Sequence, residues 1–269
     1  MKGQPFHENV CIVTGASSGI GRELALLLAE QGAWLALAAR NERHLERTAE
    51  ACRKMGGRAI VVPTDVTDEE QCKQLIEKTA QEYDRIDTLF NNAGISMVAR
   101  FDEVEDLSPM KKIMDVNYYG SVYCTHYALP FLLQTEGRIV GVSSLTGKTG
   151  VPTRSFYAAS KHAMAGFFDS LRIELVERGV TVTMIYPGFV ASEVRERALG
   201  PDGEPRGESN IDESNTMSTE KCAELILRSA GRRKRELVMT TKAKIGMWVK
   251  LIAPSLLDRI TKRTVERGG

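Results

Sequence analysis

The sequence lacks the features that mark secreted, membrane-spanning and metal-binding proteins. Its five cysteines form no C-x-x-C pair, which argues against a disulfide framework and indicates the reduced, buried thiols of an intracellular protein. No uncharged run reaches the ~20 residues that cross a bilayer, and the N-terminus has no apolar segment typical of a signal peptide. The histidines have no carboxylate or cysteine partners at ligand spacing. We therefore expect a cytoplasmic protein without a metal site.

The net charge is only +1, which gives no reason to expect nucleic acid as a partner, but the charge is unevenly distributed. Residues 228–269 contain 12 Lys and Arg against 3 Asp and Glu, so this end is basic and the remainder is acidic. A length of 269 residues with 42% hydrophobic residues suits one α/β domain. We expect this domain over residues 1–241 and a basic tail over residues 242–269.

Short apolar, β-branched runs alternate with longer helical patterns along the chain, which predicts βαβ units and a parallel sheet. The resulting fold class is α/β, a single Rossmann-type doubly wound domain with seven strands and ligands at the carboxyl ends of those strands. The predicted strands lie near residues 10–14, 34–39, 59–63, 87–91, 137–143, 180–186 and 236–239. The predicted helices lie near residues 19–31, 43–55, 68–83, 107–133, 156–178 and 218–230.

One long stretch, residues 188–217, has no regular pattern. Irregular segments of this length in compact domains are usually functional lids or disordered. Because the stretch begins at the carboxyl end of a predicted strand, we favour a substrate lid over disorder.

The first predicted strand runs into three glycines, Gly15, Gly19 and Gly21, spaced G-x-x-x-G-x-G. Glycines permit a tight turn and close approach of the backbone, and the N–H groups of the following helix can face a pyrophosphate. Ser17 and Ser18 can add hydroxyl donors. A purely structural strand-to-helix turn is the alternative explanation, and the flanking strand and helix favour a dinucleotide site.

The end of the second predicted strand bears on the choice of cofactor. An acidic residue there would accept hydrogen bonds from the adenosine ribose and select NAD. This chain has Ala39 followed by Arg40, whose guanidinium can bind a 2′-phosphate. A solvated arginine that starts a helix is the alternative, but the missing acid favours NADP(H).

Tyr157 and Lys161 lie four residues apart, so a helix places both side chains on one face. A phenol with a pKa of ~10 is a poor proton donor at neutral pH unless a nearby ammonium stabilises the phenolate. Ser144 ends an apolar run 13 residues before Tyr157 and can donate to a substrate oxygen. An isolated Y-x-x-x-K is usually a plain surface pair, so the surrounding motifs decide its meaning.

Four motifs together resemble those of the short-chain dehydrogenase/reductase family. Residues 14–21 match its glycine-rich cofactor motif, and Asn-Asn-Ala-Gly at 91–94 matches its fourth-strand motif. Residues 157–161 match its Y-x-x-x-K motif, and residues 187–192 resemble P-G-x-V-x-T with serine in the last place. The resemblance covers roughly residues 8–240, with all motifs in order.

The resemblance implies Tyr157 as acid/base, Ser144 as the donor that orients the substrate, and Asn117 as part of a proton relay. It implies that Lys161 binds the nicotinamide ribose and lowers the pKa of the tyrosine. The implied cofactor-binding residues are Gly15, Ser17, Ser18, Gly19, Ile20, Gly21, Arg40, Asp65, Val66, Asn92, Ala93, Gly94, Tyr157, Lys161, Pro187, Gly188, Val190 and Ser192. The implied substrate-binding residues are Met97, Leu145 and Phe189.

The leading functional hypothesis is an NADP(H)-dependent oxidoreductase that interconverts a carbonyl and a secondary alcohol. The alternative is a dinucleotide-binding regulatory or scaffold protein without turnover, and the complete set of four catalytic residues argues against it. The loop at 145–152 and the tail resemble the 11β-hydroxysteroid dehydrogenase-like members, which by analogy implies a lipophilic small-molecule substrate. The family also implies a homodimer or homotetramer.

The tail contains a helical stripe of apolar residues that Pro254 should kink or split. One interpretation is a helix that packs on its own domain or across a dimer. The other is a helix that rests on an anionic membrane, with its lysines and arginines on phosphates. The stripe consists of Ile245, Trp248, Val249, Ile252 and Leu256.

Overall fold

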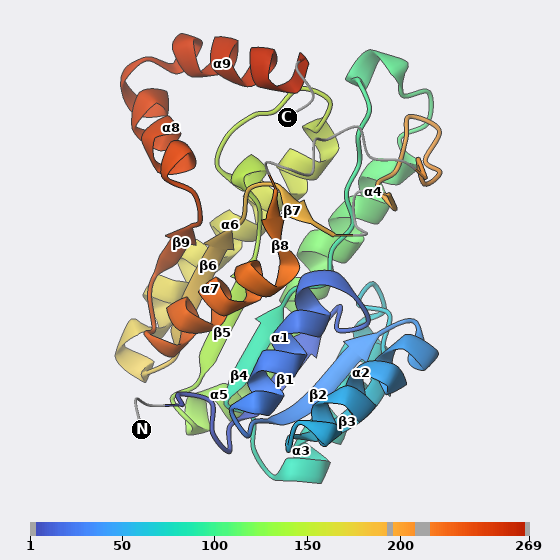
Figure 1. Ribbon diagram of the computed structural model, residues 1–269, viewed down its shortest axis with the longest axis vertical. Coiled ribbons are helices and arrows are strands. Elements are labelled where there is room, and N and C mark those ends of the chain that lie inside the picture. The colour runs from blue at the N-terminus through green and yellow to red at the C-terminus, as the bar shows by residue number, and fades with distance from the viewer. Residues whose placement is uncertain (1–3, 193–195, 208–215, 267–269) are drawn as a thin grey trace.

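The computed structural model describes residues 4–192, 196–207 and 216–266. The centre of the molecule is a parallel sheet of seven strands. Its strands are β1 (Val10–Thr14), β2 (Trp34–Ala39), β3 (Arg58–Pro63), β4 (Thr88–Asn91), β5 (Arg138–Val142), β6 (Thr181–Tyr186) and β9 (Glu236–Val238). Their order is β3-β2-β1-β4-β5-β6-β9 (Figure 1). The order reverses between β1 and β4, which is where ligands bind in such sheets.

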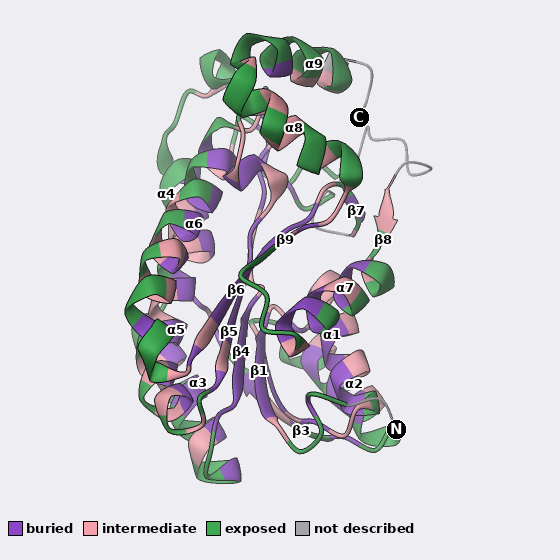
Figure 2. Ribbon diagram, turned by 90° about the vertical axis from the view of Figure 1, so that its left-hand side faces the viewer, coloured by how far each residue is buried: buried purple, intermediate pink, exposed green. Residues whose placement is uncertain are grey.

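Helices cover both faces of this sheet (Figure 2). One layer consists of α1 (Gly19–Glu30), α2 (Glu42–Lys54) and α7 (Thr219–Gly231). The other consists of α3 (Glu69–Tyr83), α5 (Gly120–Gln134) and α6 (Ser155–Leu175). A separate hydrophobic core lies between the sheet and each layer, so every residue of β1 and β4 is buried. Burial on both faces explains the continuous apolar runs in the sequence. The seven predicted strands and the doubly wound fold are confirmed.

The predicted continuous helix over residues 107–133 is wrong in one respect. The chain forms α4 (Ser108–Met114), a π-helical turn η2 (Asp115–Tyr119) and then α5. At the start of α5, a Cβ on Gly120 would lie 2.8 Å from the Cβ of Val66, so only glycine allows this close approach. The turn changes the direction in which its side chains point, and it carries the fully buried Asn117.

The predicted lid, residues 188–217, is described in part. Two short strands, β7 (Val190–Ala191) and β8 (Met217–Ser218), pair in parallel at its two ends. Residues 196–207 return on themselves, with Arg206 N donating to Ala198 O and Gly207 N donating to Glu196 O at 3.0 Å each. Residues 193–195 and 208–215 of this prediction lie outside the described residues.

The C-terminal tail forms two helices, α8 (Thr241–Ile252) and α9 (Pro254–Glu266). Pro254 is the first residue of α9, so the predicted split is confirmed, because proline is tolerated in the first turn of a helix but not in its interior. The apolar stripe does not pack closely on its own domain, since Ile245, Trp248 and Ile252 are 58%, 67% and 81% exposed, and its packing across a dimer stays a prediction. Among the described helices, none has the length and apolar character needed to cross a bilayer.

Candidate active site

The loops that follow β1 and β4 are held together by the side chains of Thr14 and Asn92. Thr14 Oγ1 donates to Phe90 O at 3.2 Å and accepts from the N–H groups of Asn92 and Ala93 at 3.0 Å each. Asn92 Nδ2 donates in return to Thr14 O at 2.9 Å. These bonds fix the glycine turn against the fourth-strand motif at the switch point of the sheet.

The glycine turn folds tightly against the start of α1. Gly15 and Gly19 have φ values of +70° and +54°, a region that favours glycine. A Cβ on Gly21 would lie only 2.2 Å from Gly15 O, so a side chain there would displace the turn. Ser18 precedes α1 without a side-chain cap, and no acidic residue lies in the first turn. The first N–H groups of the helix can therefore bind an anion.

Asn117 connects the fourth-strand loop to the helix that carries Tyr157. Its Oδ1 accepts from Ile95 N at 2.8 Å, and its Nδ2 donates to Ile95 O at 3.0 Å and to Ser160 Oγ at 2.9 Å. Ser160 Oγ in turn donates to Tyr157 O at 2.8 Å. The π-helical turn therefore places Asn117 between β4 and α6.

Ser144, Tyr157 and Lys161 converge beyond the carboxyl end of β5. The side chain of Ser144 is hydrogen bonded with that of Tyr157, and Lys161 Nζ lies 5.9 Å from the centre of the tyrosine ring. Lys161 Nζ donates to Val142 O at 2.9 Å. The adjacent Ser143 is buried and donates to Lys161 O at 3.3 Å, so it braces α6 rather than facing the tyrosine. The geometry therefore favours Ser144, which the sequence predicts, over its neighbour Ser143 as the serine that faces Tyr157.

The resemblance implies that Lys161 lowers the pKa of Tyr157, and the structure points to other groups. Burial raises the pKa of Tyr157, and the groups that lower it are Ser144, through its hydrogen bond, and the positive charge of Arg154, rather than Lys161. Burial also lowers the pKa of Lys161 to about 8, because the buried ammonium is poorly solvated. The phenol is thus predominantly protonated at neutral pH.

Arg154 is a residue that the sequence analysis missed. It precedes α6, three residues before Tyr157, and its Nη1 donates to Ser96 Oγ at 2.8 Å and to Met97 O at 3.1 Å. These bonds hold a permanent cation beside the tyrosine. In the sequence, only its position just before the predicted helix could have drawn attention to Arg154, because no motif of the family includes this residue.

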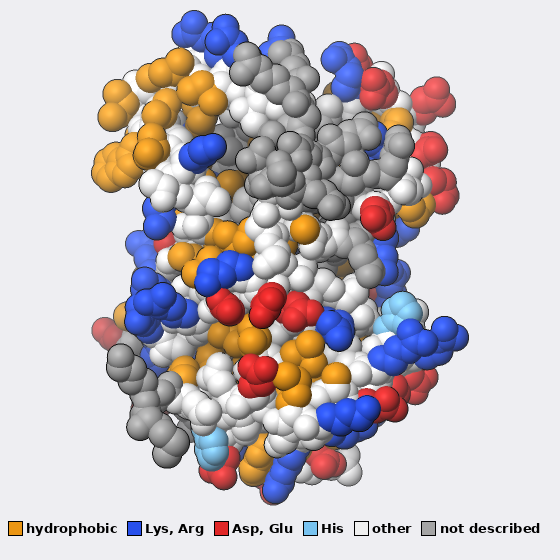
Figure 3. All heavy atoms as spheres, viewed as in Figure 1, with side chains coloured by type: hydrophobic (Ala, Val, Ile, Leu, Met, Phe, Trp, Pro, Cys, Tyr) orange, Lys and Arg blue, Asp and Glu red, His pale blue; other side chains and the backbone are white. Residues whose placement is uncertain are grey.

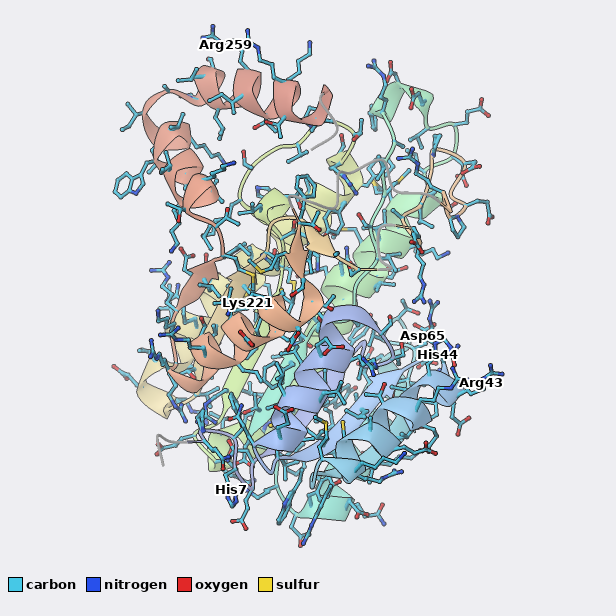
Figure 4. The ribbon with its side chains drawn as sticks, viewed as in Figure 1. His7, Arg43, His44, Asp65, Lys221 and Arg259 are labelled. Carbon is cyan, nitrogen blue, oxygen red and sulfur yellow. The ribbon has the colours of Figure 1, made fainter. Side chains whose placement is uncertain are left out.

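The residues predicted for the adenosine end lie past β2 and β3. Arg40 is exposed directly after β2. Asp65 Oδ1 accepts from the N–H and Oγ1 of Thr67, which orients the carboxylate after β3. Figure 4 shows Asp65, His44 and Arg43 at the same edge of the molecule. This edge therefore carries basic side chains next to an oriented acid.

The three predicted substrate residues do not share one environment. Phe189 is 41% exposed, Leu145 is half-buried and Met97 is 3% exposed. Met97 packs with Ala99, Ile113, Phe156 and Leu199 in a small core beside the site. Leu145 N donates to Pro187 O at 3.0 Å, which joins the loop after β5 to the loop after β6. The structure thus gives Met97 a packing role and leaves Phe189 accessible.

The short chain dehydrogenase family matches residues 9–200. The 11-beta-hydroxysteroid dehydrogenase A of Sesamum indicum is 38% identical over 255 residues, which cover 93% of this chain and 73% of that protein. The 11-beta-hydroxysteroid dehydrogenase-like 4A of Arabidopsis thaliana is 37% identical, over 94% of this chain and 84% of the relative. The Arabidopsis 11-beta-hydroxysteroid dehydrogenase 1A is 36% identical, over 94% and 75%.

The match with the family spans the glycine turn, the fourth-strand motif and the group around Tyr157, and it extends over most of the chain. The fold, the strand order and the arrangement at the switch point agree with it. The chain therefore belongs to the short-chain dehydrogenase family and is an oxidoreductase of the class that uses a nicotinamide dinucleotide.

Proposed function

We propose that this protein is an NADP(H)-dependent oxidoreductase that interconverts a carbonyl and a secondary alcohol on a lipophilic substrate. The observation that carries the proposal is the hydrogen-bonded pair Ser144–Tyr157, with Lys161 close by, next to a glycine turn that can hold a dinucleotide. A Cβ on Gly94 would lie 3.4 Å from Lys161 Nζ and 3.1 Å from Asn117 Oδ1. The glycine therefore keeps the space next to these two groups free of a side chain.

The residues present fit such a cofactor along its whole length. Arg40, Asp65 and Val66 would hold the adenosine end, and the turn at 15–21 would hold the pyrophosphate. The nicotinamide half would lie along Asn92, Ala93, Gly94, Tyr157, Lys161, Pro187, Gly188, Val190 and Ser192. When bound, the cofactor supplies or accepts the hydride.

The side chains of this chain supply the matching proton. In reduction, Tyr157 Oη donates a proton to the substrate oxygen while the carbonyl carbon receives the hydride, so the product is an alcohol. Ser144 Oγ holds the same oxygen as charge develops on it. Ser144 and Arg154 stabilise the resulting phenolate, and Lys161 with Asn117 would return the proton. The raised pKa of Tyr157 keeps this donor protonated at neutral pH.

The proposal is tested by following the absorbance of reduced nicotinamide with a panel of ketones, from small and polar to bulky and lipophilic. Turnover that improves with the apolar size of the ketone supports it. Cofactor binding without turnover across the whole panel would contradict it, and so would turnover confined to small polar ketones.

The preference for NADPH is proposed from Ala39 and Arg40. Arg40→Ala should weaken NADPH binding by the ~1.5–3 kcal/mol of a hydrogen bond to a charged group and leave NADH binding nearly unchanged. Isothermal titration with each cofactor measures both values. An equal loss for the two cofactors would rule out Arg40 as the ligand of the 2′-phosphate.

The apolar surface of the tail supports a further part of this proposal, a peripheral contact with an anionic membrane. Figure 3 shows hydrophobic side chains gathered over α8 and basic side chains along α9. Leu251 and Trp248 are 77% and 67% exposed, and Lys242, Lys244 and Lys250 are exposed on the same helix. Such a surface suits an interface of apolar chains and phosphates.

We also propose a homodimer or homotetramer and a cytoplasmic location, the latter supported by five buried free thiols.

A further inference from the structure

Thr153 adopts a backbone conformation that a β-branched residue rarely takes. Its φ is +65°, in the left-handed region, where the Cβ of an L-residue lies too close to the following carbonyl oxygen. Thr153 lies between β5 and α6, four residues before Tyr157. The other described residues with a positive φ, apart from glycine, each lie shortly before a strand, at the opposite edge of the sheet: Glu8, Asp84, Glu136 and Arg233. The strain at Thr153 therefore lies at the active site itself.

Hydrogen bonds with the loop after β4 hold Thr153 in this conformation. Thr153 O accepts from Ala99 N at 3.0 Å. The next residue, Arg154, donates through Nη1 to Ser96 Oγ at 2.8 Å and to Met97 O at 3.1 Å. Backbone strain of this kind persists only where the surrounding structure enforces it. These three bonds tie the strained residue to the loop.

The loop that is held in this way flanks the site. Ile95 is bonded through its N–H and its carbonyl to the side chain of Asn117, at 2.8 and 3.0 Å. Leu199 makes two backbone hydrogen bonds of 2.9 Å with the same loop and is 5% exposed. Residues 95–99 therefore join Asn117 on one side to Leu199 on the other, and we call them the site wall.

We propose that Thr153 is a hinge of the site wall and that Arg154 holds this hinge in its present position. The assignment rests on the proposed function, which places the substrate against this wall. When Arg154 releases the wall, Thr153 can relax to a negative φ, which turns its carbonyl away from Ala99 N. The wall then separates from the start of α6 and fits a bulky substrate less well. Thr153 is thus a positioning residue, and Arg154 acts both through its charge beside Tyr157 and through its bonds to the wall.

Hydrogen exchange at the amide of Ala99, measured by nuclear magnetic resonance without ligands, reports whether the hinge is closed. Thr153→Gly should slow this exchange about fivefold or more, since glycine adopts a positive φ without strain. Arg154→Met should speed it by about the same factor, because two hydrogen bonds to the wall are lost. The protein with both substitutions should exchange at close to the wild-type rate.

Asp84→Gly is the matched control. It replaces another left-handed residue, with a φ of +58°, at the end of α3 and far from the wall. This variant should leave the exchange at Ala99 unchanged.

Steady-state kinetics with the bulky ketones of the panel separate the two effects of Arg154. Arg154→Met should raise KM, because the wall is loose, and lower kcat, because the developing phenolate loses a stabilising charge. Adding Thr153→Gly should return KM to within about twofold of the wild type and leave kcat low, since glycine restores the wall but not the charge. A KM that stays high in the doubly substituted protein would overturn the role of the hinge in the substrate site.

The outcomes separate the hinge from the proposed function. Exchange at Ala99 that is no slower in Thr153→Gly than in the wild type would overturn the hinge on its own, whether or not Arg154→Met folds. Faster exchange in Arg154→Met that Thr153→Gly does not reverse would also overturn it, since the wall would then be held without strain at Thr153. The expected pattern of exchange without turnover of any ketone would refute the proposed function and leave the hinge intact.

Discussion

At the scale of single residues, Tyr157 lies near two cations that respond differently to pH. The pKa of Lys161 is lowered to about 8 by burial, so this charge is lost in mildly alkaline solution. The guanidinium of Arg154 stays charged over the whole range in which a tyrosine titrates. Arg154 is therefore the more dependable source of stabilisation for a phenolate.

Removing this cation should raise the pKa of Tyr157 further, because the phenolate loses a stabilising charge while the phenol is unaffected. In Arg154→Met, oxidation of an alcohol, which needs the phenolate, should reach its plateau at a higher pH than in the wild type. Nuclear magnetic resonance of ¹³Cζ-labelled tyrosine measures the pKa directly, with Tyr157→Phe to assign the signal. Ser96→Ala is the control, since it removes an anchor of Arg154 and keeps the charge. An unchanged tyrosine pKa in Arg154→Met would contradict this account.

At the scale of elements, α8 is bonded to the loop that follows Ser144. Lys148, just after the short helix η3 (Leu145–Gly147), pairs with Glu236 of β9 at 2.6 Å and lies 4.3 Å from the centre of the Tyr186 ring. Lys250 of α8 donates to Lys148 O. The tail is thereby connected to the loop beside the active site through two lysines, Lys250 and Lys148.

Lys250→Met removes the donor to Lys148 O and should loosen this connection without unfolding the domain, because one hydrogen bond of an exposed side chain contributes only about 1 kcal/mol. Hydrogen exchange of the amides in α8 and η3 should become faster. The matched control is Lys221→Met, which removes another exposed lysine whose pair with Glu224 lies within α7 (Figure 4). Faster exchange in α8 in both variants, or in neither, would argue against the bond from Lys250 to Lys148 as the connection.

The elements also show what the sequence can predict. The strands follow from apolar runs that are buried on both faces, and the glycine turn follows from spacing alone, so both were predicted within a few residues. The π-helical turn was not, and the close approach to Val66 of Gly120, which follows the turn, joins residues 54 positions apart that no local pattern connects. Arg154 was missed because its partner Ser96 lies 58 positions away in the chain. Motifs identify the functional residues at strand ends, whereas side chains that act across loops can be identified only once the fold is known.

At the scale of the whole molecule, the charge and the apolar surface of the tail lie at the same end. Arg259 of α9 points away from the body of the molecule (Figure 4), and α8 exposes Trp248 and Leu251 beside it. A surface of this kind binds anionic membranes through apolar contact and phosphate attraction together.

The full chain should therefore float with anionic liposomes at low salt, and less at high salt, since salt screens the attraction. Trp248→Ser with Leu251→Ser should reduce flotation, whereas Met55→Ser, an exposed apolar residue just after α2, should not. Sedimentation of the same proteins shows whether the surface instead joins two copies. Loss of self-association in the double variant, with no flotation of the wild type, would contradict the membrane contact.

Turnover itself is a property of the whole site, and Tyr157→Phe tests it most directly. The substitution removes the phenolic hydroxyl that carries the transferable proton and keeps the ring near Lys161. Single-turnover oxidation of bound NADPH by the best ketone of the panel is measured together with the dissociation constant for NADPH. We predict that hydride transfer falls by at least the ~10²–10⁴-fold expected for loss of a general acid, while NADPH binding changes by less than about twofold. Hydride transfer in Tyr157→Phe at a rate close to that of the wild type would contradict the account.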